Sequence, residues 1–203
     1  MSRTHHRRRR AAALPALACV GFVLIAVAGC SADAVQNPPQ AAKAPSAASP
    51  TTGQGKVADP AHIAIPSIGV DSSLMRLGLN DDRTVEVPPA DKGMTAGWYT
   101  GGAVPGERGA AVIIGHNDTR FGRAVFHDLK KIAKGADVAV RTTRGTTLHF
   151  TVTGTDTVSK NAFLTQKVYG PTTERALRLI TCAGDFDAQG HPVDNLIVYA
   201  TLR

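Results

Sequence analysis

From about Pro60 onward the sequence predicts an all-β fold, and three observations carry that prediction. Short runs rich in Val, Ile, Thr and aromatic residues recur, Gly, Pro and Asp separate them, and few stretches have helical spacing. Closely spaced short strands with turn residues between them are typical of a β-barrel or a β-sandwich. The predicted strands are residues 62–65, 84–87, 110–115, 137–142, 147–153, 177–181 and 196–201.

Helices contribute little to the predicted fold. Residues 124–133 have helical spacing, with Val125, Leu129 and Ile132 on one face. Residues 172–176 predict one further turn. The sheet is therefore the expected scaffold, with one or two short helices attached to it.

The first 30 residues form a predicted targeting segment. A basic start is followed by the apolar run 11–29 and then by Cys30, an order typical of an exported protein. The stretch VAGC at residues 27–30 resembles a bacterial lipobox, which would make Cys30 the lipidation site. The apolar run is also long enough for an uncleaved transmembrane anchor, which needs about 17–25 residues. Either alternative tethers the chain to the extracytoplasmic face of the cell membrane.

Residues 31–58 predict a flexible linker, because they are rich in Ala, Pro, Ser, Gly and Gln and lack apolar periodicity. Residues 59–203 then form one predicted domain. The net charge of +7 arises largely outside it, since residues 1–30 hold five of the 23 basic residues and no acid. The remaining 18 basic and 16 acidic residues give +2. That is an ordinary surface charge, so we expect no nucleic-acid partner.

Cys182 is the only cysteine of the predicted domain, since Cys19 and Cys30 precede the linker. An unpaired cysteine in an exported protein is a candidate reactive thiol. The alternative is a small buried apolar residue.

Two apolar stretches lead directly to reactive side chains: AAVIIGH ends at His116 and LRLITC ends at Cys182. A buried strand is a rigid mount for a catalytic group. A cysteine also needs a nearby base or cation to become a usable thiolate. His116 and Cys182 are therefore a candidate acid/base and nucleophile, although a single histidine at a strand end is more often a structural hydrogen-bonding group.

The stretches around these two residues resemble the sortase family, and more closely its actinobacterial class E and class F branches. The matching stretches, in order, are IAIPSIGVDSSL, VEVPPADKGMTAGWY, VPGERGAAVIIGHNDTRFGRAVFHDLKKIAKGADVAV and LRLITCAGDFDAQGHPVDNLIVYATL. The resemblance covers about residues 60–203. It implies an eight-stranded β-barrel, no cofactor and no metal ion.

The resemblance also implies an activity, which is cleavage after the Thr of an LPXTG-like sorting signal. Cys182 would attack the Thr carbonyl and form a thioacyl enzyme, and Thr181 beside it would contact the substrate. His116 would protonate the departing amide nitrogen and then accept a proton from the incoming amine. The implied partners are the sorting-signal peptide of an exported protein and an amine acceptor in the cell wall or on a surface protein. His62, His127, His149 and His191 match no catalytic position and are interpreted as structural or surface residues.

Asn195 departs from the pattern of the family. It lies thirteen residues after Cys182, where sortases usually carry an arginine that stabilises the oxyanion and holds the substrate. An asparagine amide can still donate a hydrogen bond to an oxyanion, but it supplies no charge. The alternative is that Asn195 only begins a strand and that another group, such as Arg123, contacts the substrate and stabilises the oxyanion.

Three classes of function remain open. A sortase is favoured. A cysteine L,D-transpeptidase is a second enzyme class, but the SHGC-type signature of that family is absent. The third is a catalytically weak or inactive surface lipoprotein that binds a partner through a groove of the barrel. The GH and TC pairs at the ends of two apolar stretches favour an enzyme, because a pure binding protein has no chemical need for them.

Overall fold

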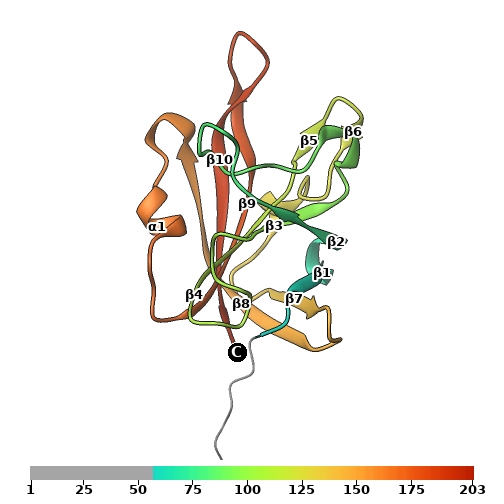
Figure 1. Cartoon of the computed structure of the whole chain (residues 1–203). Helices are drawn as coiled ribbons and strands as arrows, with labels where there is room; N and C mark the ends of the chain where they lie inside the picture. Colours follow the sequence, from blue (N-terminus) through green and yellow to red (C-terminus); the bar gives the residue numbers. More distant parts are fainter. Residues whose placement is uncertain (1–56) are drawn as a thin grey trace, which may run out of the picture. The chain divides into compact units, whose positions relative to one another are not determined.

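The computed structural model describes residues 57–203, and its strands close into an eight-stranded barrel (Figure 1). The strand order around the barrel is β1-β2-β3-β4-β9-β10-β8-β7, which confirms the predicted eight-stranded, mainly β fold. The barrel strands are β1 (Pro60–Ile65), β2 (Val70–Leu77), β3 (Ala96–Tyr99), β4 (Gly109–Ile114), β7 (Asp137–Thr142), β8 (Thr147–Ser159), β9 (Arg175–Phe186) and β10 (Pro192–Leu202). A separate two-stranded sheet pairs β5 (Asp118–Thr119) with β6 (Gly122–Arg123).

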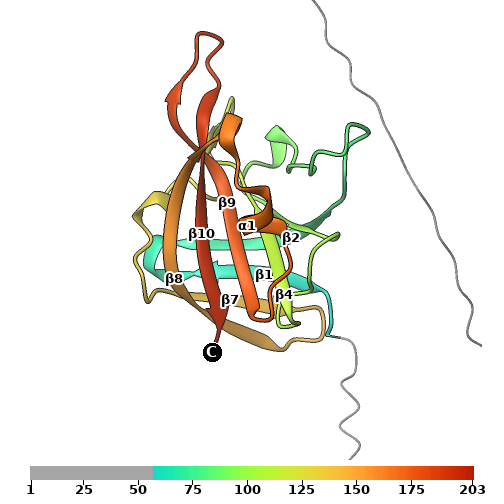
Figure 2. The ribbon, with the colours of Figure 1, turned by 90° about the vertical axis from the view of Figure 1, so that its left-hand side faces the viewer.

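Two neighbouring pairs in the barrel are parallel, β2 with β3 and β4 with β9, and the other pairs are antiparallel. Figure 2 shows β8, β10, β9 and β4 side by side, with β1 and β2 crossing behind them. The hairpin of β9 and β10 extends beyond the body of the barrel. This long hairpin matters for the site, because Cys182 lies on β9.

The barrel interior is filled by alternate residues of its strands. On β7, Val138 and Val140 are fully buried, and on β8 Phe150 and Val152 are buried in the same way. Side chains of a strand point alternately to opposite faces, so these residues face the inside. Burial of each such side chain stabilises the fold by about 1.5–3 kcal/mol.

The apolar face predicted at residues 124–133 is buried, but the predicted helix is wrong. Val125, Leu129 and Ile132 all lie in the core, whereas only Leu129–Lys131 form a 3₁₀ turn. The backbone N–H groups of this segment bond across the fold. For example, Phe126 N–H donates to the carbonyl oxygen of His116 at 2.9 Å. These partners replace the i→i−4 bonds that a helix needs.

The α-helix of the described residues is α1 (Thr165–Tyr169), and the turn predicted at 172–176 is wrong because β9 begins at Arg175. The strand predicted at 84–87 is also wrong, since only Val85 forms an isolated bridge. β8, β9 and β10 are longer than predicted, and β9 continues past Cys182 to Phe186. Cys182 therefore lies within a strand and not at its end.

The predicted targeting segment 1–30, including Cys30, and most of the predicted linker 31–58 lie outside the described residues. Between Val57 and Arg203 no helix has the length and apolar character needed to cross a membrane.

Candidate active site

The parallel pair β4 and β9 brings His116 and Cys182 to one cavity. Ile114 of β4 is in register with Ile180 of β9, and Gly115 N–H donates to the carbonyl oxygen of Ile180 at 3.1 Å. His116 and Cys182 each follow two residues later along their chains. His116 lies just beyond the end of β4 and Cys182 lies within β9, and both side chains line the same cavity.

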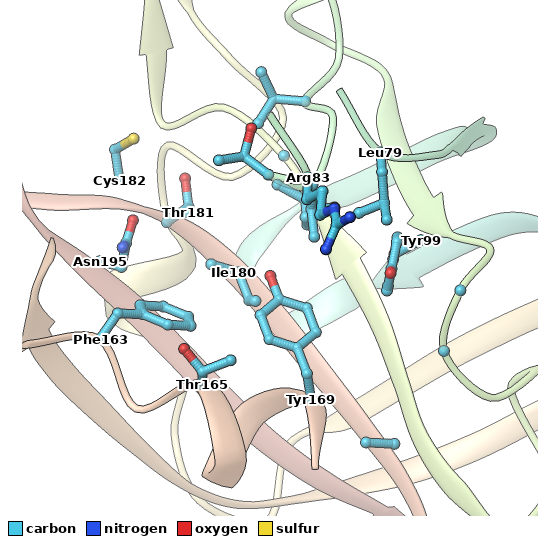
Figure 3. Close-up of a pocket in the computed structure, with 18 of the residues that line it drawn as sticks. Leu79, Arg83, Tyr99, Phe163, Thr165, Tyr169, Ile180, Thr181, Cys182 and Asn195 are labelled. Carbon is cyan, nitrogen blue, oxygen red and sulfur yellow. The ribbon is translucent and has the colours of Figure 1, made fainter. Parts of the chain in front are cut away.

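The antiparallel pair β9 and β10 places Asn195 directly opposite Cys182. Residues that face each other in an antiparallel pair point to the same side of the sheet, with Cβ atoms about 4.5–5.5 Å apart. Figure 3 shows the Asn195 amide on the strand next to Cys182, on the side of Phe163. The sheet therefore holds Cys182 and Asn195 side by side, and His116 follows the neighbouring strand β4.

These three residues line one cavity of about 680 Å³. Its wall is mainly apolar and aromatic. The rings of Tyr99 and Tyr169 meet edge to face, with their centroids 5.9 Å apart. The ring centroids of Phe163 and Tyr169 are 6.0 Å apart. Burial raises the pKa of Tyr169 to about 12, so its phenol is neutral at physiological pH and can donate a hydrogen bond. The cavity has the size and composition of a site for a small peptide segment.

A hydrogen bond fixes the orientation of the His116 ring. Its Nε2 lies 2.5 Å from the carbonyl oxygen of Pro88. A carbonyl oxygen can only accept, so Nε2 carries a proton and donates it to this bond. The bond leaves Nδ1 as the ring nitrogen that is able to accept or release a proton.

Gly115 is needed for this placement of His116. A Cβ atom at Gly115 would lie 2.6 Å from Phe126 Cδ2 and 2.7 Å from Val125 Cγ1, closer than such atoms approach each other. Phe126 also holds the next carbonyl group, that of His116, through its backbone N–H. The glycine of the GH pair therefore allows the chain to pass against the core while it delivers the histidine.

Thr181 has an unused polar group at the site. The residue is 4% exposed, and its Oγ1 has no hydrogen-bond partner among residues 57–203. An unsatisfied buried hydroxyl costs about 1–3 kcal/mol. Thr181 lies next to Cys182 in the cavity lining, and its contact with substrate stays a prediction.

A second cavity, of about 250 Å³, borders Cys182 and Thr181 from another direction. It is more polar than the first, with His127, Asp118 and Lys130 in its lining. His127 Nδ1 lies 2.8 Å from Asp118 Oδ1, an ion pair when the ring is protonated. His127 was interpreted from the sequence as structural or surface, and the structure places it within this cavity.

Arg123 is not brought to either cavity. It lies on β6 with an exposed side chain, and its guanidinium pairs with Asp128 at 3.5 Å. In contrast, the sequence did not single out Arg83, which lines the larger cavity. The turn-forming residues Asn80, Asp81 and Asp82 could have indicated a hairpin. No sequence pattern indicated that the side chain of the next residue, Arg83, would line the cavity.

The described part of the chain holds no group of three or more His, Cys, Asp or Glu side chains that could bind a metal ion. Asp185 and Asp187 are exposed on the β9–β10 hairpin, where Asp187 accepts backbone N–H bonds from Gln189 and His191.

Comparison with known proteins gives one consistent result. The sequence model of the sortase domain family matches residues 63–203. No curated protein matches the chain in sequence.

Three solved structures illustrate the similarity in fold. A lid mutant of sortase A from Corynebacterium diphtheriae is 22% identical, with a TM-score of 0.56 over 71% of this chain and 69% of that chain. Sortase C2 of Pilus Island 1 from Group B Streptococcus is 24% identical, with a TM-score of 0.54 over 70% and 73%. Sortase C-1 from Actinomyces oris is 25% identical, with a TM-score of 0.55 over 70% and 71%. These are sortases A and C, so the class E or F assignment stays a prediction.

Proposed function

Because the chain belongs to the sortase family, we propose that it is an exported cysteine transpeptidase that cleaves an LPXTG-like sorting signal and transfers the Thr carboxyl group to an amine. The observation that carries the proposal is the pairing of His116 and Cys182. They follow register-matched positions of two parallel strands and line the same cavity. A nucleophile and an acid/base held on a rigid sheet are what acyl transfer requires.

In the first half of the reaction, Cys182 gives its thiol proton to His116 Nδ1, and the Sγ thiolate attacks the carbonyl carbon of the Thr residue. The C–N bond of the following peptide link breaks, and a proton on His116 Nδ1 passes to the departing amine. A thioester between Sγ and the acyl carbon remains. The Asn195 amide, opposite Cys182, donates a hydrogen bond to the oxyanion as its charge develops.

In the second half, the acceptor amine approaches Cys182 from the smaller cavity. Its nitrogen attacks the thioester carbon, gives its proton to His116, and displaces Cys182 Sγ. Two cavities that meet at one thiol suit a reaction with two substrates, because the acyl group can stay in one while the acceptor enters through the other. This arrangement favours transfer over simple binding.

The alternative is a catalytically weak or inactive surface lipoprotein that binds its partner in the larger cavity. The observation that favours it is Asn195, which supplies no positive charge opposite Cys182. An amine-dependent assay separates the two functions. We expect the wild-type chain to form a peptide–amine product from LPXTG-like peptides, and Cys182→Ala to form none. Tight peptide binding without product from the wild type would favour the binding protein.

We also propose that the chain is anchored at the extracytoplasmic face of the membrane, by a lipid on Cys30 or by residues 11–29. Cys30→Ala distinguishes these anchors. If Cys30 is lipidated, the variant should accumulate as a heavier, unprocessed precursor. An unchanged mass of the mature protein would support the transmembrane anchor instead.

A further inference from the structure

The hairpin at residues 78–86 carries an unusual backbone conformation at Arg83. Leu79 and Val85 form a bridge, and Arg83 N–H donates to the carbonyl oxygen of Asn80 at 2.9 Å. Arg83 has φ of 66°, and among residues 57–203 it is the only residue other than glycine with positive φ. Glycine is the usual residue at this place in such a hairpin, because side chains disfavour the left-handed region. An arginine in this strained conformation is a reason to look for a use of its side chain.

Side chains of the hairpin hold this conformation in place. Asp82 accepts hydrogen bonds from Thr84 N–H at 2.9 Å and Thr84 Oγ1 at 2.6 Å, and Asn80 Nδ2 donates to Thr84 Oγ1 at 2.9 Å. Glu86 accepts from Gly78 N–H at 2.6 Å. The hydrogen bonds from Thr84 lower the pKa of Asp82, so this carboxylate stays ionised. It accepts hydrogen bonds within the turn and forms no ion pair with Arg83.

The guanidinium of Arg83 is left without a charged partner. Within residues 57–203 no carboxylate forms an ion pair with it, and this includes the neighbouring Asp81, Asp82 and Glu86. Arg83 is also the only Arg or Lys in the lining of the larger cavity, which contains no Asp or Glu. The site therefore presents one uncompensated positive charge to whatever the cavity holds.

The surroundings of Arg83 favour a carboxylate ligand. Figure 3 shows its guanidinium beside Leu79 and Tyr99, across the cavity from Cys182 and Asn195. Arg83 is exposed to solvent on one side, and the apolar and neutral aromatic walls on the other strengthen a charge interaction relative to open water. The planar guanidinium can bind both oxygens of a carboxylate at once.

Resting on the proposed function, we propose that Arg83 selects acyl donors that carry an Asp or Glu side chain in the part of the sorting peptide bound away from Cys182. The donor is the partner that becomes joined to Cys182 in the first half of the reaction and stays joined until the second. The larger cavity has the room to bind the peptide residues before its Thr. The acceptor has the smaller cavity, where the carboxylate Asp118 is accompanied by Lys130 and by His127, its hydrogen-bond partner. The cation without a charged partner lies in the larger cavity, so we assign the carboxylate ligand to the donor.

The test compares pairs of LPXTG-like peptides that differ only by Glu or Gln at one position, scanned over the residues before the cleaved bond. With the full chain and one uncharged amine acceptor, at least one position should give about tenfold higher kcat/KM for Glu than for Gln. Arg83→Gly removes the charge and also relieves the backbone strain, so it should fold normally and reduce this ratio to about one. Arg83→Glu should reverse the charge preference, so that a third peptide with Lys at the same position has a higher kcat/KM than the Glu peptide.

Arg120→Gln is the matched control, because it removes one positive charge from an exposed turn outside both cavities. It should keep the full preference for Glu. Transfer at similar rates from every Glu and Gln pair, or a Glu preference that survives in Arg83→Gly, would overturn the role of Arg83 and leave the proposed function standing. Failure of all peptides to acylate Cys182 would overturn both.

Discussion

The larger cavity has two walls that are built in different ways. The sheet wall carries His116, Cys182 and Asn195 on β4, β9 and β10 or just beyond them, and backbone ladders set their register. The loop wall consists of the hairpin at 78–86 and the segment 163–169, which are held by side-chain hydrogen bonds and aromatic packing. We infer from this difference that the sheet wall carries out the chemical step and that the loop wall determines which peptide is bound.

The largest expected effect comes from removing the thiol on the sheet wall. Cys182→Ala should lower turnover of every peptide by about 1,000-fold or more, because no other group can form the thioester. The fold should persist, since Cys182 is only half-buried. Turnover is measured with a quenched fluorescent peptide, and thermal unfolding serves as the control for folding. Residual activity within tenfold of wild type would assign the nucleophile to another residue.

Asn195 tests whether the sheet wall also supplies the oxyanion donor. Asn195→Ala should lower kcat by about 100- to 1,000-fold with little change in KM, because the hydrogen bond strengthens only as charge develops. Asn195→Asp should be at least as damaging, since it places a negative charge beside the oxyanion. Asn195→Arg restores the usual residue of the family and should retain activity. Wild-type kcat in both Asn195→Ala and Asn195→Asp would place the donor elsewhere.

Gly115 links the sheet wall to the core. Gly115→Ala forces a Cβ atom against Phe126 and Val125, at a cost of about 1–3 kcal/mol in the free energy of unfolding. The displacement should move His116, so kcat should fall for all peptides alike. Chemical denaturation and the kinetics of two unrelated peptides test this. A variant with wild-type stability and kcat would show that the close packing at Gly115 is not required.

The smallest effect is expected at the ion pair that fastens α1 of the loop wall to β8. Lys167 Nζ lies 2.5 Å from Asp156 Oδ2, and this hydrogen bond lowers the pKa of Asp156 below its ordinary value of 3.8. A lowered pKa means that the stabilisation is present above pH 3.8 and is lost as the pH falls through the lowered pKa. The Tm of wild type should exceed that of Asp156→Asn slightly near pH 7. The difference should shrink as the pH falls below 3.8, and a difference that grows on acidification would contradict the assignment.

The same contrast between walls explains what the sequence could predict. His116 and Cys182 could be proposed from the sequence because each ends an apolar stretch, and Asn195 because of its spacing from Cys182. β2 was not predicted, because the inward-facing Ser72 interrupts its apolar alternation. A polar residue is tolerated there because its hydroxyl donates to the carbonyl oxygen of Met94 and accepts from Ala96 N–H. The place of Arg83 in the cavity lining could not be predicted from the sequence, for a different reason. The direction of its side chain depends on where the barrel places the hairpin, and local sequence does not encode that position.

The central claim is that Cys182 carries the acyl group during transfer. The most direct measurement is mass spectrometry of the chain after incubation with LPXTG-like peptides and no amine acceptor. We predict an added mass equal to the peptide up to and including its Thr, located on the proteolytic fragment that contains Cys182 and absent from Cys182→Ala. Peptide binding without any adduct, or an adduct on another residue, would contradict the account.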